Sequence, residues 1–143
     1  MSQPVFGSAD AAQDAFYAAF EAGDLDAMMA VWADDDVGVE CIHPMSDRLT
    51  LREDIHTSWK NIFSSGARLT FNIRDVRRFD SDSLSVRLVH EEIRFGPRGD
   101  QRSVVIATNV YCRTGEGWLM VLHHGSPASP PQATEPPAAT QLH

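Results

Sequence analysis

The stretch that decides the fold is residues 22–44, AGDLDAMMAVWADDDVGVECIHP. Gly23 ends one helix in a left-handed conformation, and Asp24 can cap the start of the next helix. The apolar side chains of this second helix recur at helical spacing and form one inward face: Leu25, Met28, Met29 and Trp32. Three adjacent aspartates then predict a turn. The strand that follows, 37–42, ends before Pro44 because proline cannot donate to a sheet ladder.

Helices are predicted on both sides of this stretch. Upstream, Ser8 or Asp10 can cap a helix that runs to Gly23, and Gln13 would complete a capping box with Asp10. Downstream, Thr50 and the residue three positions later, a glutamate, predict a capping box for a third helix. The inward stripe of that helix is Ile55, Trp59, Ile62 and Phe63.

From residue 69 the sequence is rich in β-branched and aromatic residues, in the segments 69–79, 84–95, 103–113 and 118–124. Short turns separate these segments, which implies antiparallel hairpins. Helices followed by strands predict an α+β domain, and strands this long bend. We therefore expect a cone-shaped, mostly antiparallel sheet that packs on three N-terminal helices. The run His90-Glu91-Glu92 is interpreted as alternating exposed charges.

Composition predicts one globular domain, because the 143 residues are 43% hydrophobic and 22% charged. The predicted boundaries are an arm over 1–7, the domain over 8–125, and a disordered tail over 126–143 that holds five of the eight prolines. No apolar run could span a membrane, and the N-terminus lacks a secretory signal, so we expect a cytoplasmic protein. The two cysteines, Cys41 and Cys112, are predicted to be free thiols.

The charge distribution argues against nucleic acid as a partner. The net charge is −8, and residues 10–47 carry ten acidic residues without a lysine or arginine. The arginines at positions 74, 77 and 78 lack interleaved aromatic residues and are interpreted as a solvated strand end.

Four motifs carry a family resemblance: AFEAGDLDAMMAVWADD over the helix pair, VECIHP on the first strand, SWKNIF on the third helix, and TNVYCRTGEGWLMVLHHGSP at the end of the sheet. In this combination the chain resembles the SnoaL-like, ketosteroid isomerase-like branch of the nuclear transport factor two superfamily. The resemblance implies a cystatin-like α+β cone, an internal pocket for a small molecule, and a homodimer formed through the sheet. It implies little about chemistry, because this scaffold hosts many functions.

Carrying the catalytic residues of ketosteroid isomerases onto this sequence leaves their set incomplete. Phe16 stands where those enzymes keep an oxyanion-binding tyrosine, so the hydroxyl is missing. Glu40 stands where they keep the proton-shuttling aspartate, and their second oxyanion acid has no counterpart that we can place. Steroid isomerisation by that mechanism is disfavoured, because a base without an oxyanion donor loses its largest stabilising interaction.

The candidate catalytic residues are Glu40 and His43, each a potential general base. Alternation along the strand places them on opposite faces, unless the chain kinks at Pro44. The predicted pocket lining is Trp32, Trp59, Asn109 and His124. On the last strand, alternation places His124 on one face with Trp118, Met120 and Leu122, and His123 on the other. His43 and His124 could join Glu40 or Glu92 in a metal site, but the sequence lacks local ligand spacing, so no metal or cofactor is predicted.

Three functions remain open at this point. The first is a protein that binds a small organic molecule in a mostly apolar pocket. The second is an isomerase, cyclase or hydratase that uses Glu40 or His43 as the general base on the same pocket. The third is an oligomerisation module, since the closing strand around Trp118 and His124 is similar to that of kinase association domains.

Overall fold

The computed structural model describes residues 4–129, and the predicted tail falls largely outside the described residues. The expected α+β order is confirmed. The elements are α1 (Ala9–Ala22), α2 (Leu25–Val31), β1 (Glu40–Ile42), α3 (Arg52–Ser64), β2 (Thr70–Asp80), β3 (Leu84–Phe95), β4 (Gln101–Thr114) and β5 (Gly117–Pro127). The last strand thus continues two residues past position 125, where the sequence predicted the domain to end. No helix among residues 4–129 is long and apolar enough to cross a membrane.

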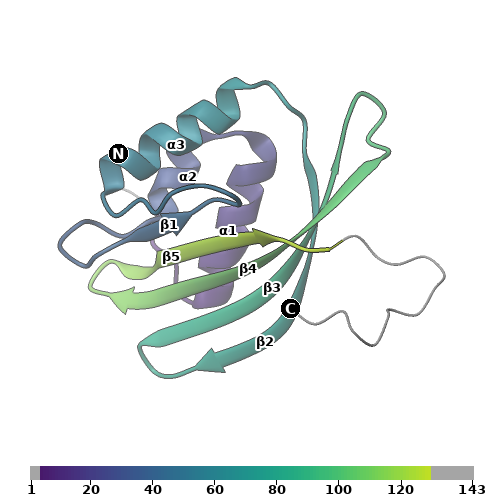
Figure 1. Cartoon of the computed structure of the whole chain (residues 1–143). Coiled ribbons are helices and arrows are strands. Elements are labelled where there is room, and N and C mark those ends of the chain that lie inside the picture. The colour runs from purple at the N-terminus through teal and green to yellow at the C-terminus, as the bar shows by residue number, and fades with distance from the viewer. Residues whose placement is uncertain (1–3, 130–143) are drawn as a thin grey trace.

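The five strands form one mixed sheet in the order β1-β5-β4-β3-β2. All neighbours are antiparallel except β1 and β5, which run parallel. Irregularities in register between Asp75 and Arg77 and between Val110 and Tyr111 bend the long strands. The sheet curves around α1, and all three helices lie on one of its faces (Figure 1), which confirms the predicted cone.

The helix pair α1–α2 is bounded largely as predicted. The hydroxyl of Ser8 accepts the Ala11 N–H at 3.0 Å, so Ser8 caps α1, and the carboxylate of Asp10 is left to bind elsewhere. Gly23 ends α1 at φ 66°, in the left-handed region that favours glycine. Asp24 caps α2 by accepting the Ala27 N–H at 3.0 Å.

The start of α3 differs from the prediction. Leu51 is the N-cap and its side chain makes no capping hydrogen bond, so the capping box predicted from Thr50 does not form. Instead Asp35, in the acidic turn, accepts the Arg52 N–H at 2.7 Å. The Arg52 guanidinium in turn donates to carbonyls at the end of α2, including that of Trp32 at 2.8 Å. The acidic turn therefore ties two helices together.

The core lies between the helices and the concave face of the sheet. Phe16 and Trp59 are both fully buried, and their rings meet edge to face with centroids 5.7 Å apart. Each such large apolar side chain contributes roughly 1.5–3 kcal/mol by its burial. Cys41 and Cys112 are both free thiols, as predicted; Cys41 is buried, whereas Cys112 is only half-buried.

Candidate functional site

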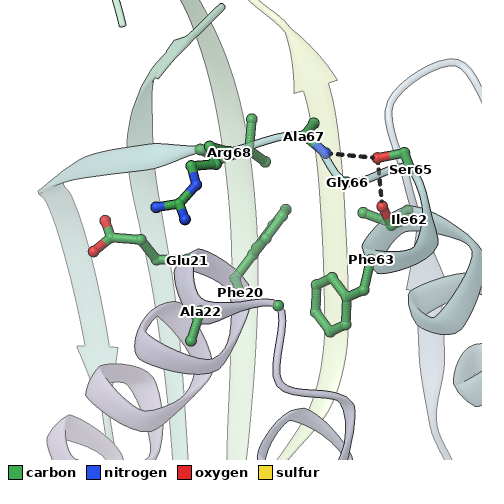
Figure 2. A pocket seen from close by; sticks show the side chains of 11 residues that line it. Phe20, Glu21, Ala22, Ile62, Phe63, Ser65, Gly66, Ala67 and Arg68 are labelled. Atoms are coloured by element: carbon green, nitrogen blue, oxygen red, sulfur yellow. Dashed lines mark hydrogen bonds between the residues drawn. The ribbon is translucent and has the colours of Figure 1, made fainter. Parts of the chain in front are cut away.

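One cavity, of about 670 Å³, lies between the ends of α1 and α3 and the segment that leads into β2. Figure 2 shows Phe20 on α1 and Phe63 on α3 as its aromatic walls, with Arg68 on the connecting segment. The ionisable side chains in its lining, Glu21 and Arg68, are both exposed. Water solvates both, so this cavity offers a partly aromatic binding surface with exposed charges at its edge.

A second cavity, of about 480 Å³, lies between α1 and the strands β2 and β3, and we call it the α1–β2 cavity. Its lining residues are Asp10, Gln13, Asp14, Tyr17, Ile73, Asp75, Arg78 and Arg87. Several of these side chains hydrogen-bond to polar residues buried behind them. A buried polar group without a partner is costly, so a connected set of this size marks a position where chemistry or ligand binding is to be sought.

The pair at the centre of this set is Tyr17 and Glu91. The Tyr17 hydroxyl donates a hydrogen bond to Glu91 Oε2 at 2.6 Å, and the two residues are only 7% and 2% exposed. Tyr17 lies one turn after Gln13 on the face of α1 that packs on the sheet. Glu91 lies on the inward face of β3 with Val89, since alternate residues of a strand share a face.

Asn109 on β4 links this pair to the rest of the interior. Its amide nitrogen donates to the Tyr17 hydroxyl at 2.9 Å and to Gln13 Oε1 at 3.3 Å. Its amide oxygen is 2.7 Å from His123 Nδ1. Because that oxygen can only accept, the hydrogen of neutral His123 lies on Nδ1. At the cavity wall, Gln13 donates to Asp75 at 3.0 Å, so an unbroken chain of hydrogen bonds joins His123 to the cavity.

The two guanidinium groups of the cavity are both paired with carboxylates. Arg87 is 3% exposed, donates to Asp10 at 2.7 Å, and lies over the ring of Tyr111 at 5.8 Å. Arg78 contacts Asp75 at 2.6 Å and Asp10 at 3.0 Å. The hydrogen bond from Arg87 is the main cause that lowers the pKa of Asp10. Neither arginine is left as an unpaired cation for a ligand.

Burial shifts the protonation of the interior groups in different directions. Desolvation raises the pKa of Glu91 from 4.5 to about 7, although the Tyr17 hydrogen bond opposes the shift. Desolvation and then the charge of Glu91 raise the pKa of Tyr17 well above 10.0, so the phenol keeps its hydrogen. Desolvation lowers the pKa of His123 to about 3, so His123 is neutral at physiological pH. Glu91 is thus the buried group that titrates near neutrality.

Three of the residues predicted for the site lie close together near His123. His43 Nε2 is 3.0 Å from Ser58 Oγ, and its ring stands edge to face on Trp59 at 4.8 Å. Trp59 is fully buried, with its ring centroid 6.2 Å from that of His123, to which Asn109 is hydrogen-bonded. Burial lowers the pKa of His43, which keeps it neutral as well.

The other predicted site residues lie elsewhere. Glu40 Oε2 forms an ion pair with Arg48 Nε at 3.0 Å, without hydrogen-bond alignment. His124 is exposed on the face of β5 that turns away from the helices, and Trp32 is a core residue at 2% exposure. Among residues 4–129, no three His, Cys, Asp or Glu side chains are placed to hold a metal ion.

The interpretation of His90-Glu91-Glu92 as alternating exposed charges is wrong for Glu91, which is 2% exposed. The residue shares the inward face of β3 with Val89 and with buried Arg87. Sequence reasoning also missed Tyr17 and Gln13 as residues of α1 that contact buried polar groups. For Glu91 the sequence did contain a signal: the alternation Val89-x-Glu91-x-Ile93 places a carboxylate within an apolar series.

Three helices on the concave face of a curved five-stranded sheet, with polar groups buried between the layers, define a cone-shaped α+β domain. Residues 9–130 match the family model for the SnoaL-like domain, and the chain belongs to this family. No curated protein matches the chain.

Solved structures confirm the wider relationship. A protein from Thiobacillus denitrificans, provisionally named a calcium/calmodulin-dependent protein kinase type II association domain, is 43% identical with a TM-score of 0.81, over 88% of this chain and 99% of that one. A provisionally named dehydratase of the NTF2-like family from Streptomyces avermitilis is 29% identical with a TM-score of 0.75, over 83% and 93%. A ketosteroid isomerase-like protein from Erwinia carotovora atroseptica, 14% identical with a TM-score of 0.72 over 85% and 94%, shares the fold.

Proposed function

We propose that the protein binds a small organic molecule in the α1–β2 cavity, against the hydroxyl of Tyr17. The observation that carries this proposal is the buried pair behind the cavity wall, in which Tyr17 donates to Glu91 at 2.6 Å. A carboxyl at 2% exposure is costly to keep in a core, because burial penalises its charged form. At a ligand-binding site, a carboxyl that is unfavourable to bury can serve a function.

The charges of the lining favour an uncharged or cationic molecule over an organic anion. Three carboxylates, those of Asp10, Asp14 and Asp75, face two guanidinium groups, which leaves a net charge of −1. Both guanidinium groups already bind carboxylates, so an incoming carboxylate would have to displace one of them. Ile73 supplies the apolar part of the wall.

A titration with small neutral and charged probes followed by NMR tests this proposal. Acetophenone, benzoate and benzylamine share one ring and differ in charge, so they separate shape from electrostatics. We expect shifts at Tyr17 and Gln13 with the neutral and cationic probes and weaker shifts with benzoate. The variant Tyr17→Phe should lower the affinity for acetophenone, whereas Glu92→Gln, on the opposite face of β3, should not. Equal affinities for all three probes, or no shift at α1, would refute the proposal.

Acid–base catalysis at the same cavity is the second candidate function. A carboxyl whose pKa is about 7 can both accept and release a proton at neutral pH. Tyr17 lines the cavity and its hydroxyl donates to Glu91, so this hydroxyl can carry that proton to a bound molecule. Elimination of water from a hydroxy-carbonyl compound needs this kind of proton transfer, and one relative of 29% identity is provisionally named a dehydratase.

Mutation distinguishes catalysis by Glu91 from the alternative predicted from the sequence, in which Glu40 or His43 is the general base. Loss of turnover in Glu91→Gln with retained turnover in Glu40→Gln and His43→Ala would support Glu91. The reverse result would return the role to Glu40 or His43, and turnover retained in all three would exclude acid–base catalysis by these groups.

Self-association is a third candidate, carried by the outer face of the sheet. No helix of residues 4–129 covers this face (Figure 1), and Phe79, Leu84 and Ile106 on it are 60%, 42% and 38% exposed. One relative of 43% identity is provisionally named an association domain. We propose a homodimer through this face, because exposed apolar side chains on an uncovered sheet surface favour an interaction site.

Sedimentation measurements test the self-association. The wild type should sediment as a dimer or larger assembly, and Ile106→Glu should shift it to the monomer. Val37→Glu is the matched control, since Val37 is 47% exposed and lies in the acidic turn, outside the strands. A wild type that is monomeric at high micromolar concentration would refute this proposal.

A further inference from the structure

The hydroxyl of Tyr17 has one hydrogen, and in the unliganded protein this hydrogen is used in the hydrogen bond to Glu91. The hydroxyl donates to Glu91 Oε2 at 2.6 Å while accepting from Asn109 at 2.9 Å. A phenol has one donor and two acceptor positions, so one acceptor position is left. An ionised Glu91 can only accept, which holds the Tyr17 hydrogen in place. A ligand oxygen that can only accept therefore finds no donor on Tyr17 in this state.

We infer that a ligand whose neutral carbonyl oxygen reaches Tyr17 binds together with one proton, which Glu91 takes up from solvent. The inference rests on the proposed function, since it assumes that the α1–β2 cavity is the binding site. It names the ligand class, carbonyl compounds without a nearby donor, and it links their binding to pH.

The proton balance is simple. One solvent proton adds to the carboxylate of Glu91, which becomes a carboxylic acid and donates to the remaining acceptor position of Tyr17. The Tyr17 hydrogen then rotates away from Glu91 and donates to the carbonyl oxygen of the ligand. No covalent bond of the ligand forms or breaks, and Asn109 keeps its hydrogen bond to the Tyr17 oxygen.

Glu91 is the proton acceptor near neutral pH, because the ionisable groups around it do not compete for the proton in this range. From α1 these are Tyr17, Asp10 and Asp14; from β2, Asp75; from β3, Arg87; from β4, Tyr111; and from β5, His123 through Asn109. Burial raises the pKa of both tyrosines well above 10.0 and lowers the pKa of His123 to about 3, so none of these three titrates between pH 6 and pH 9. Asp10 and Asp75 are held by guanidinium groups, and Asp14 is exposed.

The expected size of the effect follows from the protonation of Glu91. With a pKa of about 7 for the unliganded carboxyl, the competent fraction is nearly complete at pH 6 and about one hundredth at pH 9. The affinity for acetophenone, an acceptor-only probe, should therefore fall about a hundredfold between these pH values. The alcohol 1-phenylethanol can also donate to the free acceptor position on Tyr17, so its affinity should change much less.

Three variants sharpen the experiment. A glutamine amide can donate to Tyr17 as the protonated acid does, so Glu91→Gln should bind acetophenone with the same affinity at pH 6 and pH 9. Tyr17→Phe should bind it weakly at both. Glu92→Gln removes a neighbouring carboxylate on the outward face of β3 and should keep the wild-type pH dependence. Because Glu91→Gln could fold poorly, calorimetry of the wild type at pH 8 in phosphate and in Tris provides an independent measurement, with an expected uptake of about 0.9 proton per bound acetophenone.

The outcomes separate the inference from the proposed function. Acetophenone binding that is equal at pH 6 and pH 9, or that takes up no proton at pH 8, overturns the inference while the proposed binding site stands. Absence of binding at the α1–β2 cavity by either probe at any pH overturns the proposed function and the inference with it. A hundredfold pH dependence that survives in Glu91→Gln assigns the proton to another group and overturns the inference.

Discussion

Replacing Glu91 by glutamine should change how the stability of the protein depends on pH. The variant keeps the shape of the side chain and its hydrogen bond with Tyr17, and removes only the ionisation. Burial raises the pKa of this carboxyl from 4.5 to about 7 in the folded chain. Its stabilising contribution is therefore fully present below about pH 4.5 and is lost as the pH rises through about 7. The complete loss is about 3 kcal/mol, because one pKa unit corresponds to about 1.4 kcal/mol.

Urea unfolding at a series of pH values measures this contribution. Between pH 5 and pH 8.5 the free energy of unfolding of Glu91→Gln should rise by about 2.5 kcal/mol relative to the wild type. The control, Glu92→Gln, should keep a difference from the wild type that is constant within about 0.5 kcal/mol. A Glu91→Gln difference that is equal at both pH values would refute the argument that ionising this carboxyl destabilises the fold.

Three further perturbations have defined outcomes. Burial lowers the pKa of His123 to about 3, so its contribution to stability is present above about pH 6.5 and is lost as the pH falls. At pH 5 the free energy of unfolding of the wild type should have dropped by about 2 kcal/mol, a loss that His123→Gln does not show. Identical urea unfolding profiles of the two proteins would contradict this. Gly117 has φ +93°, and an added Cβ would lie 2.7 Å from a backbone oxygen of the N-terminal arm. Gly117→Ala should therefore destabilise the protein by on the order of 2 kcal/mol in thermal unfolding. The control Gly115→Ala, with open space around the added Cβ, should be nearly neutral. Asp24→Ala should cost about 1 kcal/mol by removing the α2 cap, and an equal cost for the control Asp26→Ala would argue against capping.

Glu91 and His123 act in opposite directions between pH 4.5 and pH 6.5. Over this range rising pH weakens the fold through Glu91 and strengthens it through His123, so the two contributions partly cancel. The single variants separate them, because each removes one of the two pH dependences.

The sequence predicted the fold because its signals are local. Gly23 and Asp24 mark the junction of two helices within a few residues, and the change from helical to strand periodicity after residue 69 separates the two layers. The free thiols and the inward face of Asn109 also follow from short-range patterns. These features depend on the residue types at fixed spacing, and the structure confirms them.

The candidate site was harder to predict because it depends on register. Alternation on β5 placed Met120 on the face opposite His123, yet both are buried, at 0% and 2% exposure. The register shift opposite Val110 and Tyr111 leaves Val121 as an extra residue, and that residue reverses the alternation. A strand pattern read in sequence has no means of showing a bulge that arises from pairing with its neighbour.

The sequence by itself thus determined the α+β cone, its family and the helix pair around residues 22–44. Only the tertiary structure decided which polar residues meet inside it. Glu40 forms an ion pair with Arg48, and Glu91, part of a run interpreted from sequence as alternating exposed charges, meets Tyr17 in the interior. The physical reason is that helix and strand propensities act over a few residues. By contrast, the burial of a carboxyl depends on side chains 74 positions apart that come together when the sheet curves around α1.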